Sequence, residues 1–248
     1  MSTFALKILA AVLMVIDHIG YYFEGMPLVL RMVGRASYPL FLFCMVWGLH
    51  YTKNRKLYLL RLYLGSLFMT TLIYLVDTWM PTPGGYGNHN IFLSMFLVGL
   101  LVTALELFGQ NSKRGALLLG GSFLAQVLYY GLPSLVPFAR NLSGDLLTGV
   151  VPNLALNEYG FAFVALGVAM YFLRENRPMF TAMYILFCIY QFSAEMLPGG
   201  TPIQWLMIVA LPLMLRYNGK KGPGMKYFFY VFYPAHTFLL FYLANFVL

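Results

Sequence analysis

Nine long apolar stretches, separated by short polar breaks, constrain this chain more than any other feature of its sequence. They cover residues 4–23, 31–51, 57–76, 90–109, 115–132, 159–173, 178–197, 202–217 and 225–246. A helix needs about 20 apolar residues to cross the hydrocarbon core of a bilayer. The sequence therefore predicts an all-α, polytopic transmembrane helix bundle of about nine spans. The chain length allows roughly eight to ten spans, and we expect a single domain over residues 1–248.

The charge content supports this interpretation. Only 10% of the 248 residues are charged, against about 25% in soluble globular proteins, so a soluble chain of this size could not cover its surface. The net charge of +8 does not indicate a nucleic-acid partner, because Lys and Arg gather in the cytoplasmic loops of membrane proteins. The partner that the composition predicts is the lipid bilayer. Cys44 and Cys188 lie in apolar stretches, and we expect buried apolar side chains there, neither a disulfide nor a metal site.

Basic residues mark alternate loops, and this pattern sets the orientation. The basic breaks hold Lys53, Arg55 and Lys56, then Lys113 and Arg114, then Arg174 and Arg177, and finally Lys220 and Lys221. Because such loops stay in the cytoplasm, the N-terminus is predicted to be cytoplasmic. The break at 131–158 contains a weaker apolar piece, 145–156, which forms either a re-entrant or surface helix or a tenth span. A tenth span would break the alternation, so the charge pattern favours nine.

Three basic residues depart from this pattern: Arg31, Arg35 and Arg140. Arg31 and Arg35 are four residues apart, so they share one helix face. Arg35 lies several residues inside the second span, where an ionisable side chain is a functional hypothesis by default. The alternative is that both arginines extend to the phosphates of the outer leaflet.

The first span carries two more ionisable residues, about two-thirds of the way toward the outer side. Asp17 and His18 are roughly 100° apart on the helix, so they face different neighbours. Arg31 and Arg35 are the nearest cations, and a buried Asp–Arg pair is more tolerable than either charge alone. We expect Asp17 to pair with one of these arginines and His18 to face a cavity. A histidine beside an aspartate and two nearby arginines favours a functional role for His18; the alternative is a histidine that only forms an interhelical hydrogen bond.

Two further residues can be related to His18. Lys7 lies eleven residues before it, nearly three helical turns, so both project from one face about 16 Å apart along the axis. Such a face suits a long ligand with an anionic head in the cytoplasm and a reactive tip in the membrane, as in a coenzyme A thioester. His236 follows Pro234, which opens the preceding helical turn. His236 either meets the His18 face or the thioester path, or is only a hydrogen-bonded histidine in a kinked helix.

Two stretches, LKILAAVLMVIDHIGYYF and LRMVGRASYPLFLFCMVWGLHYTKNRKLYLLRL, resemble the TraX family of bacterial inner-membrane proteins. The namesake of this family acetylates the N-terminus of F-type pilin. The resemblance is close over the first 65 residues, and residues 110–220 match only by hydropathy. Its motifs are Asp17-His18-Ile19-Gly20, Gly34-Arg35, Pro39-Leu40-Phe41, Gly48, Thr52-x-Asn54-x-Lys56, Asn90-Ile91-Phe92 and Tyr233-Pro234-x-His236. The spacing from Lys7 to His18 also looks like the signature of the wider acyltransferase-three superfamily.

The resemblance implies a transmembrane acetyltransferase of the bacterial inner membrane, with acetyl-CoA as acyl donor and no metal. His18 would act as general base or carry the acetyl group itself, and Asp17 with Arg31 or Arg35 would orient the site. His236 is a further catalytic candidate. The residues expected to hold the coenzyme A part are Lys7, Lys53, Arg55, Lys56, Arg61, Lys220, Lys221 and Tyr233.

The acceptor side is less defined. Asn90, Glu158 and Glu195 are candidate contacts to an acceptor, although Asn90 can equally cap a helix. A surface glycan, a lipid and a peptide N-terminus all remain possible acceptors, and the acyl chain and a homo-oligomeric state stay open. A competing function is a small-solute transporter or flippase with Asp17, His18 and Arg35 as a proton relay, although no inverted repeat is visible. A third is a non-catalytic assembly factor for a surface structure.

Overall fold

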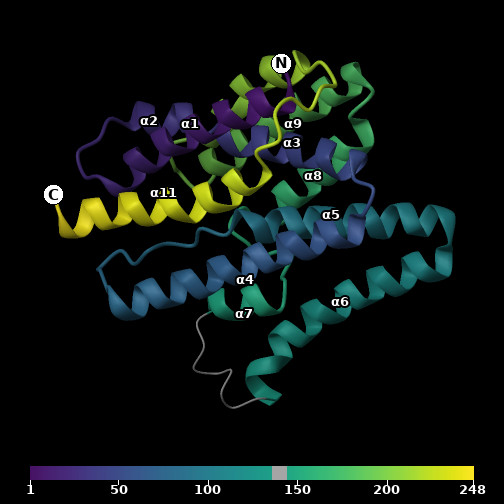
Figure 1. Ribbon diagram of the computed structural model, residues 1–248, viewed down its shortest axis with the longest axis horizontal. Coiled ribbons are helices and arrows are strands. Elements are labelled where there is room, and N and C mark those ends of the chain that lie inside the picture. Colours follow the sequence, from purple (N-terminus) through teal and green to yellow (C-terminus); the bar gives the residue numbers. More distant parts are fainter. Residues whose placement is uncertain (136–143) are drawn as a thin grey trace. The chain divides into compact units, whose positions relative to one another are not determined.

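The computed structural model describes residues 1–135 and 144–248, and these contain helices and turns but no strand. Arg140, one of the basic residues that depart from the charge pattern, lies outside the described residues. The elements are α1 (Thr3–Tyr22), α2 (Leu28–Gly34), α3 (Ser37–Tyr51), α4 (Arg55–Trp79), α5 (Ile91–Gln110), α6 (Ser112–Leu135), α7 (Gly144–Val150), α8 (Gly160–Leu173), α9 (Arg177–Met196), the 3-10 helix η2 (Gln204–Val209), α10 (Ala210–Leu215) and α11 (Lys226–Phe246) (Figure 1).

The predicted helical membrane fold is confirmed in its main feature. Among the described residues, seven helical segments are long and apolar enough to cross a membrane, and α2 with α3 forms one of them, Leu28–Tyr51. Two of the nine predicted spans are shorter apolar helices, Gly160–Leu173 and Gln204–Leu215. Helix α8 has 14 residues and is therefore about 21 Å long, against about 30 Å of hydrocarbon. The count of nine crossings and the cytoplasmic N-terminus stay predictions.

A tenth span over residues 145–156 is wrong. Helix α7 has seven residues and ends at Val150, so it is about 10 Å long, far less than a bilayer core needs. Residues 151–159 that follow it are turns and bends. Of the two alternatives for this piece, the described residues fit the short re-entrant or surface helix.

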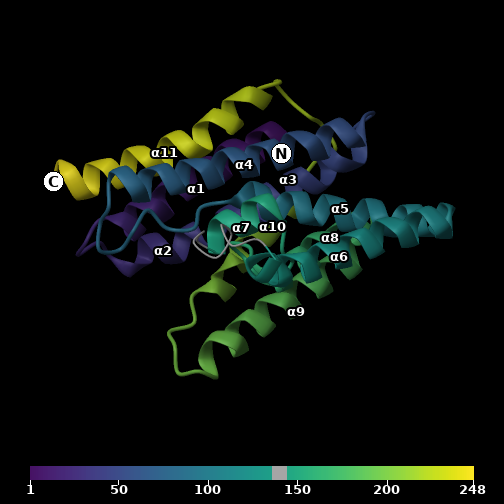
Figure 2. The same cartoon turned by 90° about the horizontal axis from the view of Figure 1, so that it is seen from below.

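The chain forms two compact units. Unit 1 contains Met1–Gly48 and Ala169–Leu248, and unit 2 contains Leu49–Val168. In unit 2, the long helices α4, α5 and α6 follow one another along the chain, and the short α7 lies beside α4 (Figure 2). Gly149 of α7 packs so closely on Thr70 of α4 that a Cβ at this position would overlap the threonine side chain.

Helices α1 and α11 of unit 1 lie side by side and run in the same direction (Figure 1). Near their beginnings, the Lys7 ammonium lies 5.4 Å from the ring centroid of Phe229. Near their ends, the rings of Tyr22 and Phe241 are 6.0 Å apart. Residues at equal depth along the two helices can therefore meet, which matters for the histidine that each helix carries.

The start of α1 is held by a basic loop. The Ser2 hydroxyl accepts a hydrogen bond from the Ala5 amide and caps the helix. The Thr3 amide donates to the carbonyl of Lys220 at 2.9 Å, and the next amide donates to the carbonyl of Lys221 at 3.0 Å. The first free N–H groups of α1 are thus satisfied, and Lys220 and Lys221 lie at the same end of unit 1 as the start of α1.

Reporter fusions test the predicted orientation. A reporter that works only in the cytoplasm should be active when fused at Asn111 and silent at Gly85, both in unit 2. The corresponding pair in unit 1 is Gly219, expected active, and Gly199, expected silent. The reason is the excess of Lys and Arg in the loops predicted to be cytoplasmic. Activity at Gly85 and Gly199 with silence at the other two sites would reverse the orientation.

Candidate functional site

The ionisable residues of the first two predicted spans meet in unit 1. Asp17 of α1 binds two arginines: its Oδ2 lies 2.6 Å from Arg31 Nη1, and its Oδ1 lies 2.5 Å from Arg35 Nη2. The predicted Asp–Arg pairing is confirmed and is more extensive than expected, because each carboxylate oxygen has its own arginine. The three side chains are 14–23% exposed. We use the name polar cluster for Asp17, His18, Arg31, Arg35 and His236.

Further hydrogen bonds fix the two arginines in place. Arg31 Nη1 also donates to the Asp17 carbonyl at 3.2 Å, and Arg35 Nε donates to the Arg31 carbonyl at 3.1 Å. Arg35 Nη1 donates to the side-chain oxygen of Gln204 at 3.2 Å. The arginines are therefore bound within the protein, and this contradicts the alternative that they only extend to lipid phosphates. One carboxylate between two guanidinium groups leaves a net charge of +1.

Glycine is required where α2 ends. A Cβ at Gly34 would overlap the Asp17 side chain, including its carboxylate oxygen. The close approach of α2 to α1 at this point lets Arg31 and Arg35 reach the same carboxylate. The Gly34-Arg35 motif thus has a physical reason in the geometry of the ion pair.

His18 and His236 form a direct pair within unit 1. Both residues are buried, with 7% and 8% of their surface exposed, and His18 Nδ1 lies 3.0 Å from His236 Nε2. Of the alternatives left open for His236, the contact with His18 is the one that the structure shows. The parallel course of α1 and α11 brings the two histidines to one depth. The His18 ring also packs against Tyr21, Tyr22 and His236, and the expectation that it faces a cavity stays a prediction.

The hydrogen bonds determine which nitrogen carries each proton. His236 Nδ1 lies 2.8 Å from the Phe232 carbonyl, and a carbonyl only accepts, so this nitrogen donates. In a neutral imidazole the other nitrogen accepts, so His236 Nε2 accepts from His18 Nδ1. The lone pair of neutral His18 then resides on Nε2, and this nitrogen can take a proton. The Phe232 ring, stacked on His236 at 4.5 Å, holds the acceptor histidine in position.

Two residues near the polar cluster were missed by the sequence analysis. The Arg31 guanidinium lies 5.0 Å from the ring centroid of Tyr21, and the same ring lies 6.5 Å from that of His18. Tyr21 is three residues after His18, so helical spacing could have identified it. Gln204, the partner of Arg35, is 169 residues away in sequence and gives no local signal.

The predicted acceptor contacts have partners within the protein. The Asn90 side chain caps α5 by accepting from Leu93 N at 3.2 Å, and its amide donates to Ser66 and Thr70. Glu158 accepts from the Asn90 backbone at 2.8 Å, so these two residues are brought together in unit 2. In unit 1, Glu195 accepts from the amides of Ile203 and Gln204 at the start of η2. These contacts give all three residues structural roles, and an acceptor role stays a prediction.

The residues expected to hold coenzyme A are divided between the units. Lys7, Lys220, Lys221 and Tyr233 belong to unit 1, and Lys53, Arg55, Lys56 and Arg61 belong to unit 2. Lys53, Lys56, Lys220 and Lys221 are exposed. Arg55 forms an ion pair with Glu106, and Tyr233 is buried. Neither of these two side chains is therefore readily accessible to a ligand. Cys44 and Cys188 are buried, as expected.

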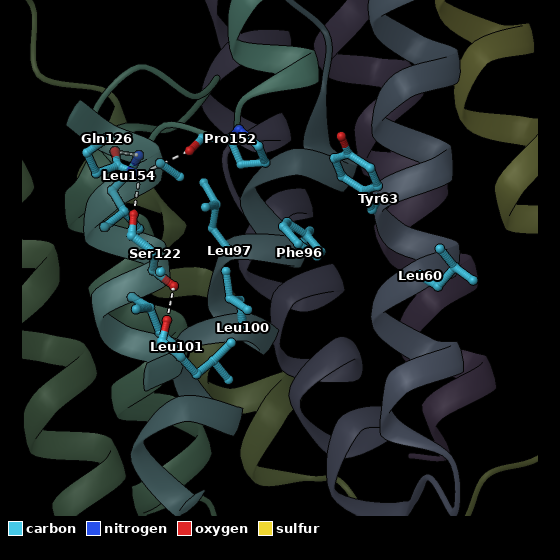
Figure 3. A pocket seen from close by; sticks show the side chains of 13 residues that line it. Leu60, Tyr63, Phe96, Leu97, Leu100, Leu101, Ser122, Gln126, Pro152 and Leu154 are labelled. Atoms are coloured by element: carbon cyan, nitrogen blue, oxygen red, sulfur yellow. Dashed lines mark hydrogen bonds between the residues drawn. The ribbon is translucent and has the colours of Figure 1, made fainter. Parts of the chain in front are cut away.

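An apolar cavity of about 350 Å³ lies in unit 2, between α4, α5, α6 and residues 152–154 (Figure 3). None of the 13 residues that line it is charged. The Gln126 side chain at its wall is already bound, because it donates to the Pro152 carbonyl at 3.0 Å and accepts from Leu154 N at 2.8 Å. The hydroxyl of Tyr63, also in the wall, donates to the Val150 carbonyl at 2.9 Å. The cavity thus presents no charged or histidine side chain, and the polar cluster is the better candidate site.

The sequence is similar to a known protein family and to a protein of named role. A family model described as TraX protein matches residues 2–139 and 146–244. The chain is 27% identical over 256 residues to the probable fimbrial assembly protein FimC, serogroup H1, of Dichelobacter nodosus, and the alignment covers 96% of this chain and 94% of that protein. No solved structure matches.

Proposed function

The chain belongs to the TraX family, and from this premise we propose that it is a membrane-bound acetyltransferase. It would move an acetyl group from cytoplasmic acetyl-CoA to a hydroxyl or amine at the outer side of the bacterial inner membrane. The observation that carries the proposal is the hydrogen-bonded His18–His236 pair beside the Asp17–arginine ion pairs. A base oriented by a second group and placed near excess positive charge is the arrangement that acyl transfer needs.

In the proposed reaction, His18 Nε2 takes the proton of the acceptor hydroxyl or amine as the acceptor atom attacks the thioester carbonyl. The new bond joins the acceptor oxygen or nitrogen to the acetyl carbon. The net charge of +1 on Asp17, Arg31 and Arg35 stabilises the oxyanion that forms. The tetrahedral intermediate then collapses, the carbon–sulfur bond breaks, and the thiolate of coenzyme A takes the proton from His18.

His236 has a positioning role in this proposal. By accepting from His18 Nδ1 it keeps the basic lone pair on Nε2, and it stabilises the imidazolium that forms during transfer. Direct transfer needs only one proton-accepting nitrogen, so we prefer it to an acetyl-histidine intermediate. The spacing of Lys7 and His18 adds a likeness to the acyltransferase-three superfamily, which stays a prediction.

The FimC relative suggests an acceptor class and a second candidate function. Its name describes a probable fimbrial assembly protein, so the N-terminus of a fimbrial subunit is our first candidate among the possible acceptors. The same name also fits a non-catalytic assembly factor. The polar cluster favours catalysis, because an assembly role does not require a buried histidine pair oriented for proton transfer.

The experiment that tests the proposal measures binding and transfer in parallel. The purified protein, in detergent and in liposomes, is given acetyl-CoA, and its melting temperature and the labelling of membrane extract from radiolabelled acetyl-CoA are recorded. At 100 times the dissociation constant the ligand should stabilise the protein by about 2.7 kcal/mol. Binding with transfer supports the acetyltransferase. Binding without any transfer to the membrane extract contradicts the acetyltransferase, and the absence of binding favours the assembly factor or the transporter.

A further inference from the structure

A second cavity, which the proposed reaction does not use, lies in unit 1. It measures about 380 Å³ and is lined by aromatic and basic side chains together. This volume falls in the range of small-molecule sites, about 300–1,000 Å³. We call it the basic pocket, and its lining includes Phe43, Trp47, Arg174, Arg177, Tyr217 and Asn218.

The aromatic wall of the basic pocket is a compact group. The ring of Tyr217 lies 5.0 Å from that of Trp47 and 5.6 Å from that of Phe43. Ring faces of this kind stack on the base of a nucleotide without reading its identity. Trp47 and Phe43 belong to α3, so a regular helix positions this wall.

The basic wall contains a buried donor. Arg174 Nη1 donates to the Tyr171 carbonyl at 2.5 Å, and Nη2 lies 3.2 Å from the carboxylate of Glu175. Arg174 Nε is buried and has no hydrogen-bond partner among the described residues. The side chain is only 16% exposed. A buried donor that lacks an acceptor is costly, and an anionic ligand in the pocket would supply one.

The charge around the basic pocket is positive. Arg174 and Arg177 line it, and Lys220 and Lys221 follow directly after the lining residue Gly219. Glu175 is the acidic residue among the lining residues. Arginine forks match phosphate oxygens, so the pocket combines a stacking wall with a phosphate-binding wall.

The distance from this pocket to the polar cluster fits the donor. The Thr3 hydroxyl donates to the Tyr217 hydroxyl at 3.2 Å, so the pocket lies at the level where α1 begins. His18 is fifteen residues further, or about 22 Å along the helix axis. The phosphopantetheine arm of coenzyme A has about 13 bonds between phosphorus and sulfur, which span roughly 15 Å when extended, and the diphosphate adds about 5 Å.

We propose that the basic pocket binds the 3′-phosphorylated adenosine diphosphate end of acetyl-CoA. The inference rests on the proposed acetyltransferase function. Trp47 stacks on the adenine, with the buried rings of Phe43 and Tyr217 supporting it from behind, and Arg174 with Arg177 binds the phosphates. The pantetheine arm then runs along α1, past Lys7, toward His18. In this proposal the residues of the basic pocket are the main contacts to the nucleotide, in place of the unit 2 residues that the sequence suggested, Lys53, Arg55, Lys56 and Arg61.

Binding measurements in lipid nanodiscs test this site. The probes are acetyl-CoA, 3′,5′-adenosine diphosphate and S-acetylpantetheine, which lacks the nucleotide. Arg174→Gln and Trp47→Ala should each weaken acetyl-CoA binding about 10- to 100-fold and leave S-acetylpantetheine binding unchanged. Arg174→Lys should be intermediate, because it keeps the charge and loses the fork. Arg114→Gln, the same chemical change at an exposed basic residue of unit 2, is the matched control and should bind acetyl-CoA as the wild type does.

The outcomes separate this inference from the proposed function. If the wild type binds no acetyl-CoA, both are overturned. If it binds and Arg174→Gln, folded by its melting temperature, binds equally well, only the basic pocket is overturned. If anionic lipid in the nanodisc displaces the 3′,5′-adenosine diphosphate without affecting acetyl-CoA, the pocket holds a lipid phosphate and the inference fails. Should Arg174→Gln not fold, the Trp47→Ala and Arg174→Lys results decide.

Discussion

Replacing His18 by alanine should lower acetyl transfer about 10²- to 10⁴-fold, the usual value of a positioned general base. His18 Nε2 is the nitrogen that the hydrogen bonds of His236 leave with the lone pair. Binding of acetyl-CoA should change little, because the nucleotide end contacts other residues. The measurement is transfer from labelled acetyl-CoA to membrane extract, with binding recorded on the same preparation.

Three variants serve as controls for this result. His50→Ala removes a histidine near the end of α3, in unit 2, and should transfer at the wild-type rate. His236→Ala should reduce transfer about tenfold, the value of one orienting hydrogen bond of about 1.4 kcal/mol. His236→Gln should recover part of this loss, because its side-chain oxygen can accept from His18 Nδ1. If His18→Ala transfers acetyl groups at the wild-type rate, another residue is the general base. If the variant also loses acetyl-CoA binding, His18 has a structural role or contacts the donor.

How well the sequence predicted the site depends on how local each contact is. Asp17 lies only 14 and 18 residues from Arg31 and Arg35, across one short loop, so a hairpin of two spans brings them together. The charge pattern alone was enough to predict this pairing. The His18–His236 contact joins residues 218 apart, and sequence analysis left it as one of several possibilities. It depends on α1 and α11 packing in parallel, which no pattern in either helix specifies.

The other residues whose roles the sequence did not predict share one physical reason. In the sequence, Trp47 and Phe43 resemble any lipid-facing aromatic residues of a membrane helix, and Arg174 resembles any basic loop residue. They become a pocket only because the loop before α9 and the segment after α10 meet at the end of α3. Glu195 similarly suggested a ligand contact, and it binds two backbone amides at the start of η2. Spans and charges follow from composition, whereas packing between distant helices does not.

Asp17→Ala should reduce the free energy of unfolding by up to about 3–5 kcal/mol, the cost of breaking a buried ion pair, because it leaves two largely buried arginines, 16–23% exposed, without their carboxylate. The structure makes this the most sensitive position of the polar cluster, because two arginines share the one carboxylate. Asp17→Ala/Arg35→Leu should recover part of the stability, and adding Arg31→Leu should recover more. None of these variants should transfer acetyl groups, because without Asp17 the guanidinium groups that stabilise the oxyanion are no longer held in position.

Unfolding in mixed detergent micelles, followed by circular dichroism, gives the stability of each variant. The matched control is Glu106→Ala, which removes the carboxylate of the more exposed Arg55 pair and should cost about 0–1 kcal/mol. Coupling between Asp17 and Arg35 appears as a departure from the sum of the single changes, well beyond the 0.3–0.5 kcal/mol scatter of independent sites. Strict additivity would mean that the two side chains do not interact. The polar cluster would then lose the charge arrangement on which the proposed oxyanion stabilisation depends, even if His18 remained essential for transfer.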